Sequence, residues 1–111
     1  MELQFKDVDN TLIVKLEGEL DHHVAKTIRV ELDEVISNKR SKNLIFNLEK
    51  MNFMDSSGIG VIIGRYKKLS KMGGKVAVVG VSEKVDKIFS LAGLYSIINK
   101  YENQNEALKW I

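Results

Sequence analysis

The feature that most constrains the fold is a nearly continuous β-branched run, Val76 to Val81. A strand covered on one face alternates apolar and polar side chains, whereas a strand covered on both faces is apolar at almost every position. This run therefore predicts a central strand with other elements packed on both of its faces. A second strand is predicted at Leu44 to Leu48, which is also mostly apolar.

Amphipathic segments lie around these two strands. Apolar residues recur at helical spacing in three segments, Val24 to Ile36, Ile59 to Met72 and Val85 to Ala92. Asp21 and Ser82 are suitable N-caps for the first and third of the helices that this spacing predicts. Glycine ends the second and third patterns. Gly73-Gly74 follows the second segment, and Gly93 is a suitable C′ residue for the third.

The two ends of the chain complete the predicted order of elements. Alternating apolar residues between Leu3 and Leu16, on either side of Asp9-Asn10, predict an antiparallel hairpin. A last strand is expected at Ile97 to Tyr101 and a short helix at Asn105 to Ile111. The resulting order is ββαβαβαβα, and helical crossovers make the later strands parallel. We expect one α/β domain over residues 1–111, with a mixed, mainly parallel sheet.

Composition excludes several classes of function. The 111 residues are 44% hydrophobic, which is enough for one compact domain, and the absence of cysteine excludes disulfides, thiolate metal sites and a cysteine nucleophile. The 17 Lys and Arg against 15 Asp and Glu are scattered along the chain, so we expect no nucleic-acid partner. With no signal peptide and no apolar stretch long enough to span a bilayer, we expect a cytoplasmic protein without a membrane partner.

The segment Met51 to Gly60 carries the most information about function. It joins a strand to a helix through two apolar side chains and a cluster of small polar ones. Asp55 or Ser56 can cap the helix, and the dipole at a helix start favours negative charge, including a phosphate. Local pattern leaves both readings open, a simple N-cap and a phosphate site. We expect Gly60 and Gly64, one turn apart, to permit close packing of the helix on the sheet.

Enzymatic readings find little support. Gly58, Gly60 and Gly64 only superficially resemble a dinucleotide-binding loop, because a long segment separates them from the preceding strand. Gly73-Gly74-Lys75 is not a phosphate loop, because Val76 follows Lys75 where Ser or Thr would bind magnesium. His22 and His23 are adjacent, so they cannot share one helix face as metal ligands. A hydrolase using Ser56 lacks the Gly-x-Ser-x-Gly context of a nucleophile elbow. We expect no cofactor and no catalytic residue.

Several motifs occur in order along nearly the whole chain. They are Gly18-Glu19-Leu20-Asp21-His22-His23, Asn47-Leu48-Glu49, Phe53 to Lys67 with its Asp55-Ser56-Ser57-Gly58 core, Gly73-Gly74 and Phe89 to Leu94. Together they closely resemble the STAS domain of anti-sigma F factor antagonists from spore-forming bacteria. The resemblance implies a partner-switching cycle, in which the antagonist binds an anti-sigma factor that is also a serine kinase and so releases the sigma factor.

The resemblance also implies roles for individual residues. Ser56 would be phosphorylated by the partner, which supplies the ATP site, and a phosphoserine phosphatase would reset the switch. We expect the interface to contain Asp21, Asp55, Ser56, Ser57, Gly58 and Ile59. Asp21 has an equally plain reading as an N-cap, and Ile59 or Met54 would add apolar contact only if it faces outward. The alternatives are a STAS module of a stress-response regulator and a small nucleotide-dependent hydrolase.

Overall fold

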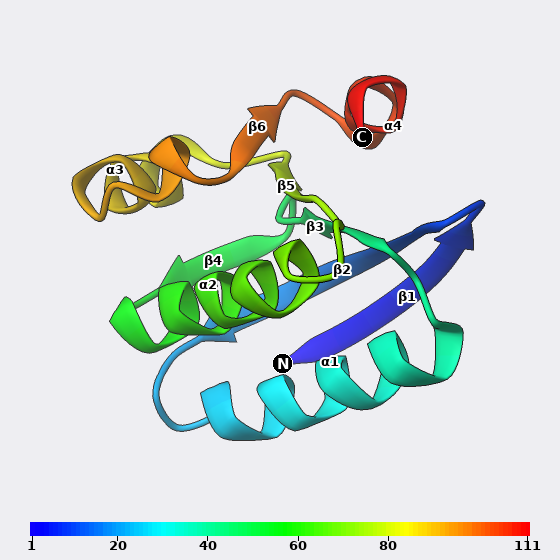
Figure 1. Cartoon of the computed structure of the whole chain (residues 1–111). Coiled ribbons are helices and arrows are strands. Elements are labelled where there is room, and N and C mark those ends of the chain that lie inside the picture. Colours follow the sequence, from blue (N-terminus) through cyan, green and yellow to red (C-terminus); the bar gives the residue numbers. More distant parts are fainter.

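The computed structural model describes all residues, 1–111, as a sheet flanked by helices (Figure 1). The strands are β1 (Glu2–Val8), β2 (Thr11–Leu20), β3 (Asn43–Asn47), β4 (Met51–Met54), β5 (Val76–Val79) and β6 (Asn99–Tyr101). The helices are α1 (Ala25–Lys39), α2 (Ser56–Ser70), α3 (Glu83–Leu91) and α4 (Gln104–Trp110), with a 3₁₀ turn at Leu94–Ser96. None of these helices has the length and apolar character needed to span a bilayer.

The sheet confirms the predicted α/β class. Its strand order is β1-β2-β3-β5-β6, and β4 pairs with the C-terminal end of β2. The β1–β2 hairpin is antiparallel and turns at Asp9-Asn10, and every other pairing is parallel. Because the strands from β2 onward are parallel, α1, α2, α3 and α4 all begin at the carboxyl edge of the sheet.

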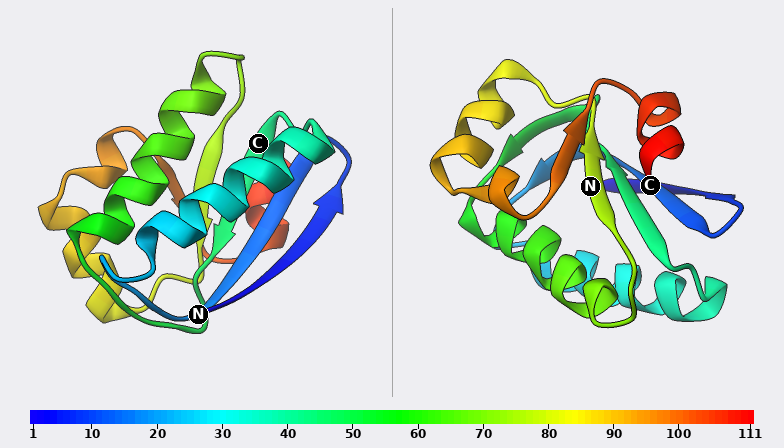
Figure 2. Two further views of the ribbon diagram at one scale, coloured as in Figure 1. Left: turned by 90° about the horizontal axis from the view of Figure 1, so that it is seen from below. Right: turned by 45° about the horizontal axis from the view of Figure 1, so that its top comes forward.

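Helices cover both faces of the sheet, but unequally. Helices α1 and α2 lie side by side on one face and α4 lies on the other, as the right-hand view of Figure 2 shows. The larger core lies under α1, α2 and α3 and includes Phe46, Ile62 and Phe89, all fully buried. A smaller core under α4 joins Ile45 and Ala107. Strand β5 is buried at all four positions, as its β-branched pattern predicts.

Two local predictions were wrong. Met51–Met54 was expected to be part of a loop but forms β4, so the order of elements is ββαββαβαβα, and pairing with β2 follows a register shift between Gly18 and Glu19. Asp21 was expected to cap α1, whereas the N-cap is Val24, which makes no side-chain capping bond. The caps Ser82 of α3 and Gly93 as its C′ residue are confirmed.

A buried ion pair joins the two helices on the larger face. Arg65 of α2 is only 6% exposed, and its Nε lies 3.0 Å from Oδ1 of Asp33 on α1. The N–H does not point at that oxygen, so the contact is electrostatic and not a hydrogen bond. Burial lowers the pKa of Arg65, and Asp33 opposes that change. The guanidinium therefore stays charged and depends on Asp33.

We expect Asp33→Ala to lower the free energy of unfolding by about 1–2 kcal/mol, because it leaves a buried charge without its partner. Asp33 is one-third exposed, which keeps the loss below that of a fully buried pair. Urea denaturation followed by circular dichroism measures it. Glu34→Ala, next to it on the exposed side of α1, is the control and should change stability by less than about 0.5 kcal/mol. Equal stability of the two variants would contradict the ion pair.

Candidate functional site

The start of α2 is organised by the carboxylate of Asp55. Its Oδ1 accepts hydrogen bonds from the backbone N–H groups of Ser57, at 2.9 Å, and Gly58, at 3.2 Å. Asp55 has extended backbone angles and is the N-cap, so Ser56 is the first helical residue. Ser56 is exposed and its hydroxyl is not needed for capping. The structure thus separates two roles that the local pattern left open.

The same carboxylate holds the β2–α1 connection against α2. Oδ2 of Asp55 accepts a hydrogen bond from the backbone N–H of His22, at 3.2 Å, and lies 3.8 Å from Nδ1 of the His22 ring. This contact spans 33 residues of sequence. It brings the loop that follows β2 next to Ser56, as expected for two segments at the carboxyl edge of one sheet.

Asp21 orders that loop. Its Oδ1 accepts from the backbone N–H of His23, at 2.9 Å, and its own carbonyl accepts from Val24 and Ala25. Partial burial acts to raise the pKa of Asp21, but the His23 and Val24 amides and the two nearby histidines outweigh it and lower the pKa. Asp21 is therefore a carboxylate at neutral pH, beside a second carboxylate, Asp55. Both carboxylates are held in the two loops that meet next to Ser56.

Asp55→Ala should lower the free energy of unfolding by about 1 kcal/mol, because two helix N–H groups lose their acceptor. Chemical denaturation measures this loss. Asp55→Asn keeps an oxygen acceptor at the same position and is the matched control, with a loss of only a few tenths of a kcal/mol. If Asp55→Ala were as stable as the control, the carboxylate would not be the cap.

The apolar residues of this segment face inward. Met54 is fully buried and Ile59 is 8% exposed, so neither offers an apolar contact surface. Of the two possibilities that the sequence left open, the structure shows the second, because both side chains belong to the core under α2. Gly58 is also buried, and a Cβ there would lie 2.8 Å from the carbonyl oxygen of Leu20. The glycine at this position is therefore required by packing of α2 against β2.

Gly60 and Gly64 do not have the role predicted for them. A Cβ at either position would meet no atom within 4 Å, so neither glycine permits close packing on the sheet. Gly60 is exposed and lies one turn after Ser56 on the same side of the helix. No side chain therefore projects from α2 at the position one turn after Ser56. Sequence reasoning missed this surface, since a glycine pattern alone does not distinguish buried from exposed glycines.

Comparison with known proteins identifies the family of this site. Residues 2–107 match the STAS domain family. The chain belongs to the STAS family. An anti-sigma F factor antagonist of Paenibacillus polymyxa is 38% identical over 108 residues, which cover 97% of this chain and 92% of that protein. An anti-sigma-B factor antagonist of Bacillus subtilis (strain 168) is 31% identical over 94 residues, covering 85% and 84% of the two chains.

Structural comparison agrees with the sequence comparison. The phosphorylated form of the Bacillus cell fate determinant SpoIIAA superposes with a TM-score of 0.74 at 31% identity, covering 97% of each chain. The STAS fold therefore accounts for the whole molecule, including the mixed sheet and four helices. Within this STAS domain, Asp21, Asp55, Ser56 and Ser57 come together at the carboxyl edge of the sheet, whereas Ile59 turns into the core. The domain is that of an anti-sigma factor antagonist.

Proposed function

We propose that the unphosphorylated chain binds an anti-sigma factor that is also a serine kinase, releases the sigma factor, and is inactivated by phosphorylation of Ser56. The observation that carries this proposal is the exposed Ser56 hydroxyl at the first position of α2, left free because Asp55 serves as the cap. The likeness to an anti-sigma F factor antagonist and to a phosphorylated SpoIIAA supports it.

Phosphorylation would act on the interface and leave the fold intact. A phosphate adds about −1.5 to −2 charges, and the dipole at a helix start favours that charge. The Ser57 and Gly58 amides already donate to Asp55, so the phosphate cannot use them without displacing the cap. It would therefore project outward beside the Asp55 and Asp21 carboxylates. A partner that packs there would have to desolvate or displace it, at a cost on the order of several kcal/mol.

The proposed contact surface consists of Asp21, Asp55, Ser56 and Ser57, with the exposed Gly60 alongside, whereas Gly58 is buried against β2. Ile59 would contribute only its 8% exposed fraction. The chain would be a substrate of the kinase and not an enzyme, with ATP bound by the partner. A phosphoserine phosphatase would restore the binding form. An exposed hydroxyl beside carboxylates, outside any cavity, suits a substrate of a kinase.

Displacement of a sigma factor tests the function. The purified chain is added to preformed complexes of sigma factor with anti-sigma factor from a spore-former, and free sigma factor is measured by size-exclusion chromatography. We expect release from the sigma F complex. Release only from a sigma B complex would favour the alternative, a stress-response switch, which the 31% identity to an anti-sigma-B factor antagonist keeps open. Release from neither, or nucleotide hydrolysis by the chain alone, would contradict the proposal.

A further inference from the structure

A second surface lies at the opposite end of α1 and α2 from Ser56. A cavity of about 440 Å³ is lined by residues at the end of α1, in the loop between α1 and β3, and at and just after the end of α2. Helix α2 has 15 residues, so at about 1.5 Å per residue the cavity lies roughly 20 Å from Ser56. The volume falls in the range typical of small-molecule sites.

The lining is cationic and contains no acidic residue. Arg40, Lys42 and Lys68 contribute the charges, and the exposed Met72 and the buried Ile36 contribute apolar surface. None of the six ion pairs in the chain includes Arg40 or Lys42, while Lys68 lies 3.5 Å from Asp33. Two of the three cations are therefore available to an anion, and the third is partly neutralised.

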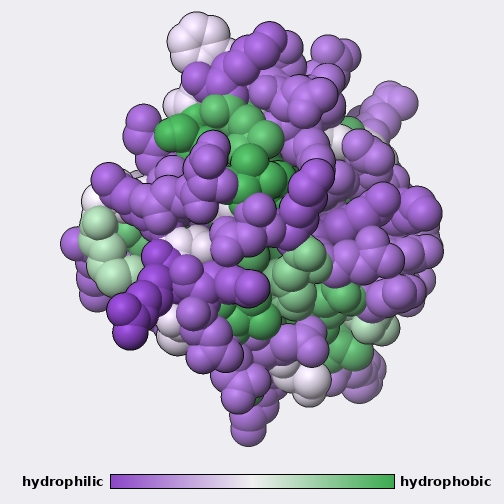
Figure 3. Space-filling view, turned by 90° about the vertical axis from the view of Figure 1, so that its right-hand side faces the viewer, coloured by the Kyte–Doolittle hydropathy of each residue, from purple (hydrophilic) through white to green (hydrophobic).

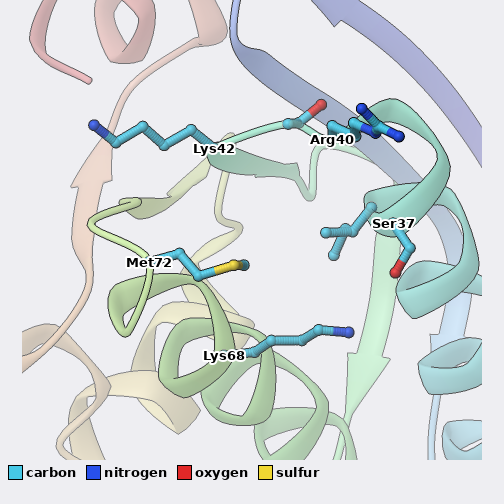
Figure 4. A pocket seen from close by; sticks show the side chains of 7 residues that line it. Ser37, Arg40, Lys42, Lys68 and Met72 are labelled. Atoms are coloured by element: carbon cyan, nitrogen blue, oxygen red, sulfur yellow. The ribbon is translucent and has the colours of Figure 1, made fainter.

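The arrangement of these side chains leaves the cavity open. Figure 4 shows Lys68 reaching from α2 toward Ser37, Arg40 at the turn that ends α1, and Lys42 pointing away from Arg40. The Lys42 side chain runs beside Gly73, so its ammonium stands at the turn after α2. Seen from this side of the molecule, in Figure 3, the surface is mainly hydrophilic and is interrupted by apolar areas.

Two observations indicate that the cavity is built for a ligand. Ser41 lines it and is only 6% exposed, yet its Oγ has no hydrogen-bond partner, which is uncommon for a buried hydroxyl. This hydroxyl is therefore free to donate to a ligand without breaking an existing hydrogen bond. Arg40 has φ +54°, a left-handed C-cap position where glycine is usual. This conformation costs an arginine backbone energy that glycine would not pay.

We propose that this cavity binds a small soluble phosphate monoester with an apolar body. The phosphate would lie at the Arg40 guanidinium, whose planar donors match phosphate oxygens, and would accept from Ser41. The apolar body would lie against Ile36 and Met72. Lys42 and Lys68 would add longer-range attraction. The site is independent of the proposed switch, since its residues lie at the far end of α2.

Phenyl phosphate is a suitable probe, because it joins a phosphate to a small apolar ring. In a titration of the ¹⁵N-labelled chain, we expect saturable amide shifts confined to residues 36–42 and 68–73. Inorganic phosphate should bind at least tenfold more weakly, since it lacks the apolar body. Shifts spread over the whole lysine-rich surface, or no saturation, would overturn the proposal.

Arg40→Gly is the decisive variant, because glycine accepts the left-handed angles and the fold is preserved. It should melt at the same temperature or higher, and bind phenyl phosphate at least tenfold more weakly. Lys109→Gln on α4, outside the cavity, is the matched control and should bind normally. Unchanged affinity in Arg40→Gly would overturn the assignment. Binding only to phosphatidylglycerol vesicles would do so too, in favour of a membrane surface.

Discussion

Ser56→Glu is expected to weaken binding to the anti-sigma factor by at least a hundredfold, while the melting temperature stays within a few degrees of the parent. A glutamate at the first position of a helix is favoured by the dipole, so the fold should tolerate it. At the interface it adds a carboxylate beside Asp55 and Asp21, in a place where the parent has a small hydroxyl. A hundredfold loss corresponds to about 2.7 kcal/mol, within reach of one desolvated or repelled charge.

Isothermal titration with the purified anti-sigma factor measures this loss, and two variants make it specific. Ser56→Ala should bind within about threefold of the parent, because it adds neither charge nor bulk. Ser56→Gln has the size of glutamate without its charge, and it separates steric from electrostatic exclusion. Normal binding by Ser56→Glu would show that Ser56 lies outside the interface. Phosphorylation of Ser56 would then not block binding as proposed.

Gly58→Ala is expected to lower the free energy of unfolding by about 2–3 kcal/mol. The added Cβ would stand 2.8 Å from the carbonyl oxygen of Leu20 and would also clash with Cγ of Met54. Methionine can move, but the oxygen belongs to the backbone of β2, so α2 must shift away from the sheet. Helix propensity favours alanine by about 0.5–1 kcal/mol, which offsets only part of the cost. Chemical denaturation measures the net change.

Gly60→Ala is the matched control for that prediction, two residues along the same helix. A Cβ at Gly60 meets nothing within 4 Å, so the helix gains propensity without strain. We expect its free energy of unfolding to rise by up to about 1 kcal/mol. Similar changes in the two variants would show that Gly58 is retained for helix conformation alone and not for packing on β2.

Much of the fold is predictable from local pattern. The β-branched residues of β5, the helical spacing in α2 and the Asp9-Asn10 turn each depend on near neighbours in sequence, and the structure confirms all three. Strand β4 was missed because Met51–Met54 is short and mixes apolar and polar residues, as in a loop. Its pairing with β2, beyond the register shift at Gly18, is a long-range contact that no local pattern shows.

The site was predictable in part. An acidic N-cap beside a small hydroxyl residue is visible in sequence, but only the three-dimensional structure distinguishes Asp55 from Ser56 as the cap. The hydrogen bond from His22 to Asp55 joins two separate loops, and spacing along the chain does not show it. The open surface at Gly60 was missed for the same reason. The exposure of Gly60 depends on which face of α2 packs against the sheet.

Charge illustrates the same limit. The lysines are scattered in the sequence, but several gather in space because α1 and α2 end at the same edge of the sheet. Arg40, Lys42 and Lys68 meet at one cavity although up to 28 positions separate them. The opposite edge carries the Asp21 and Asp55 carboxylates. A net charge of only +2 therefore does not show that three cations meet at one cavity.

The most direct test of the central claim is to locate the phosphate. The chain is incubated with an anti-sigma F kinase and ATP, and the modified residue is mapped by tandem mass spectrometry. We predict one phosphate, on Ser56, in the parent and in Ser57→Ala, and none in Ser56→Ala. Phosphate on Ser57 alone, or modification that persists in Ser56→Ala, would contradict the account.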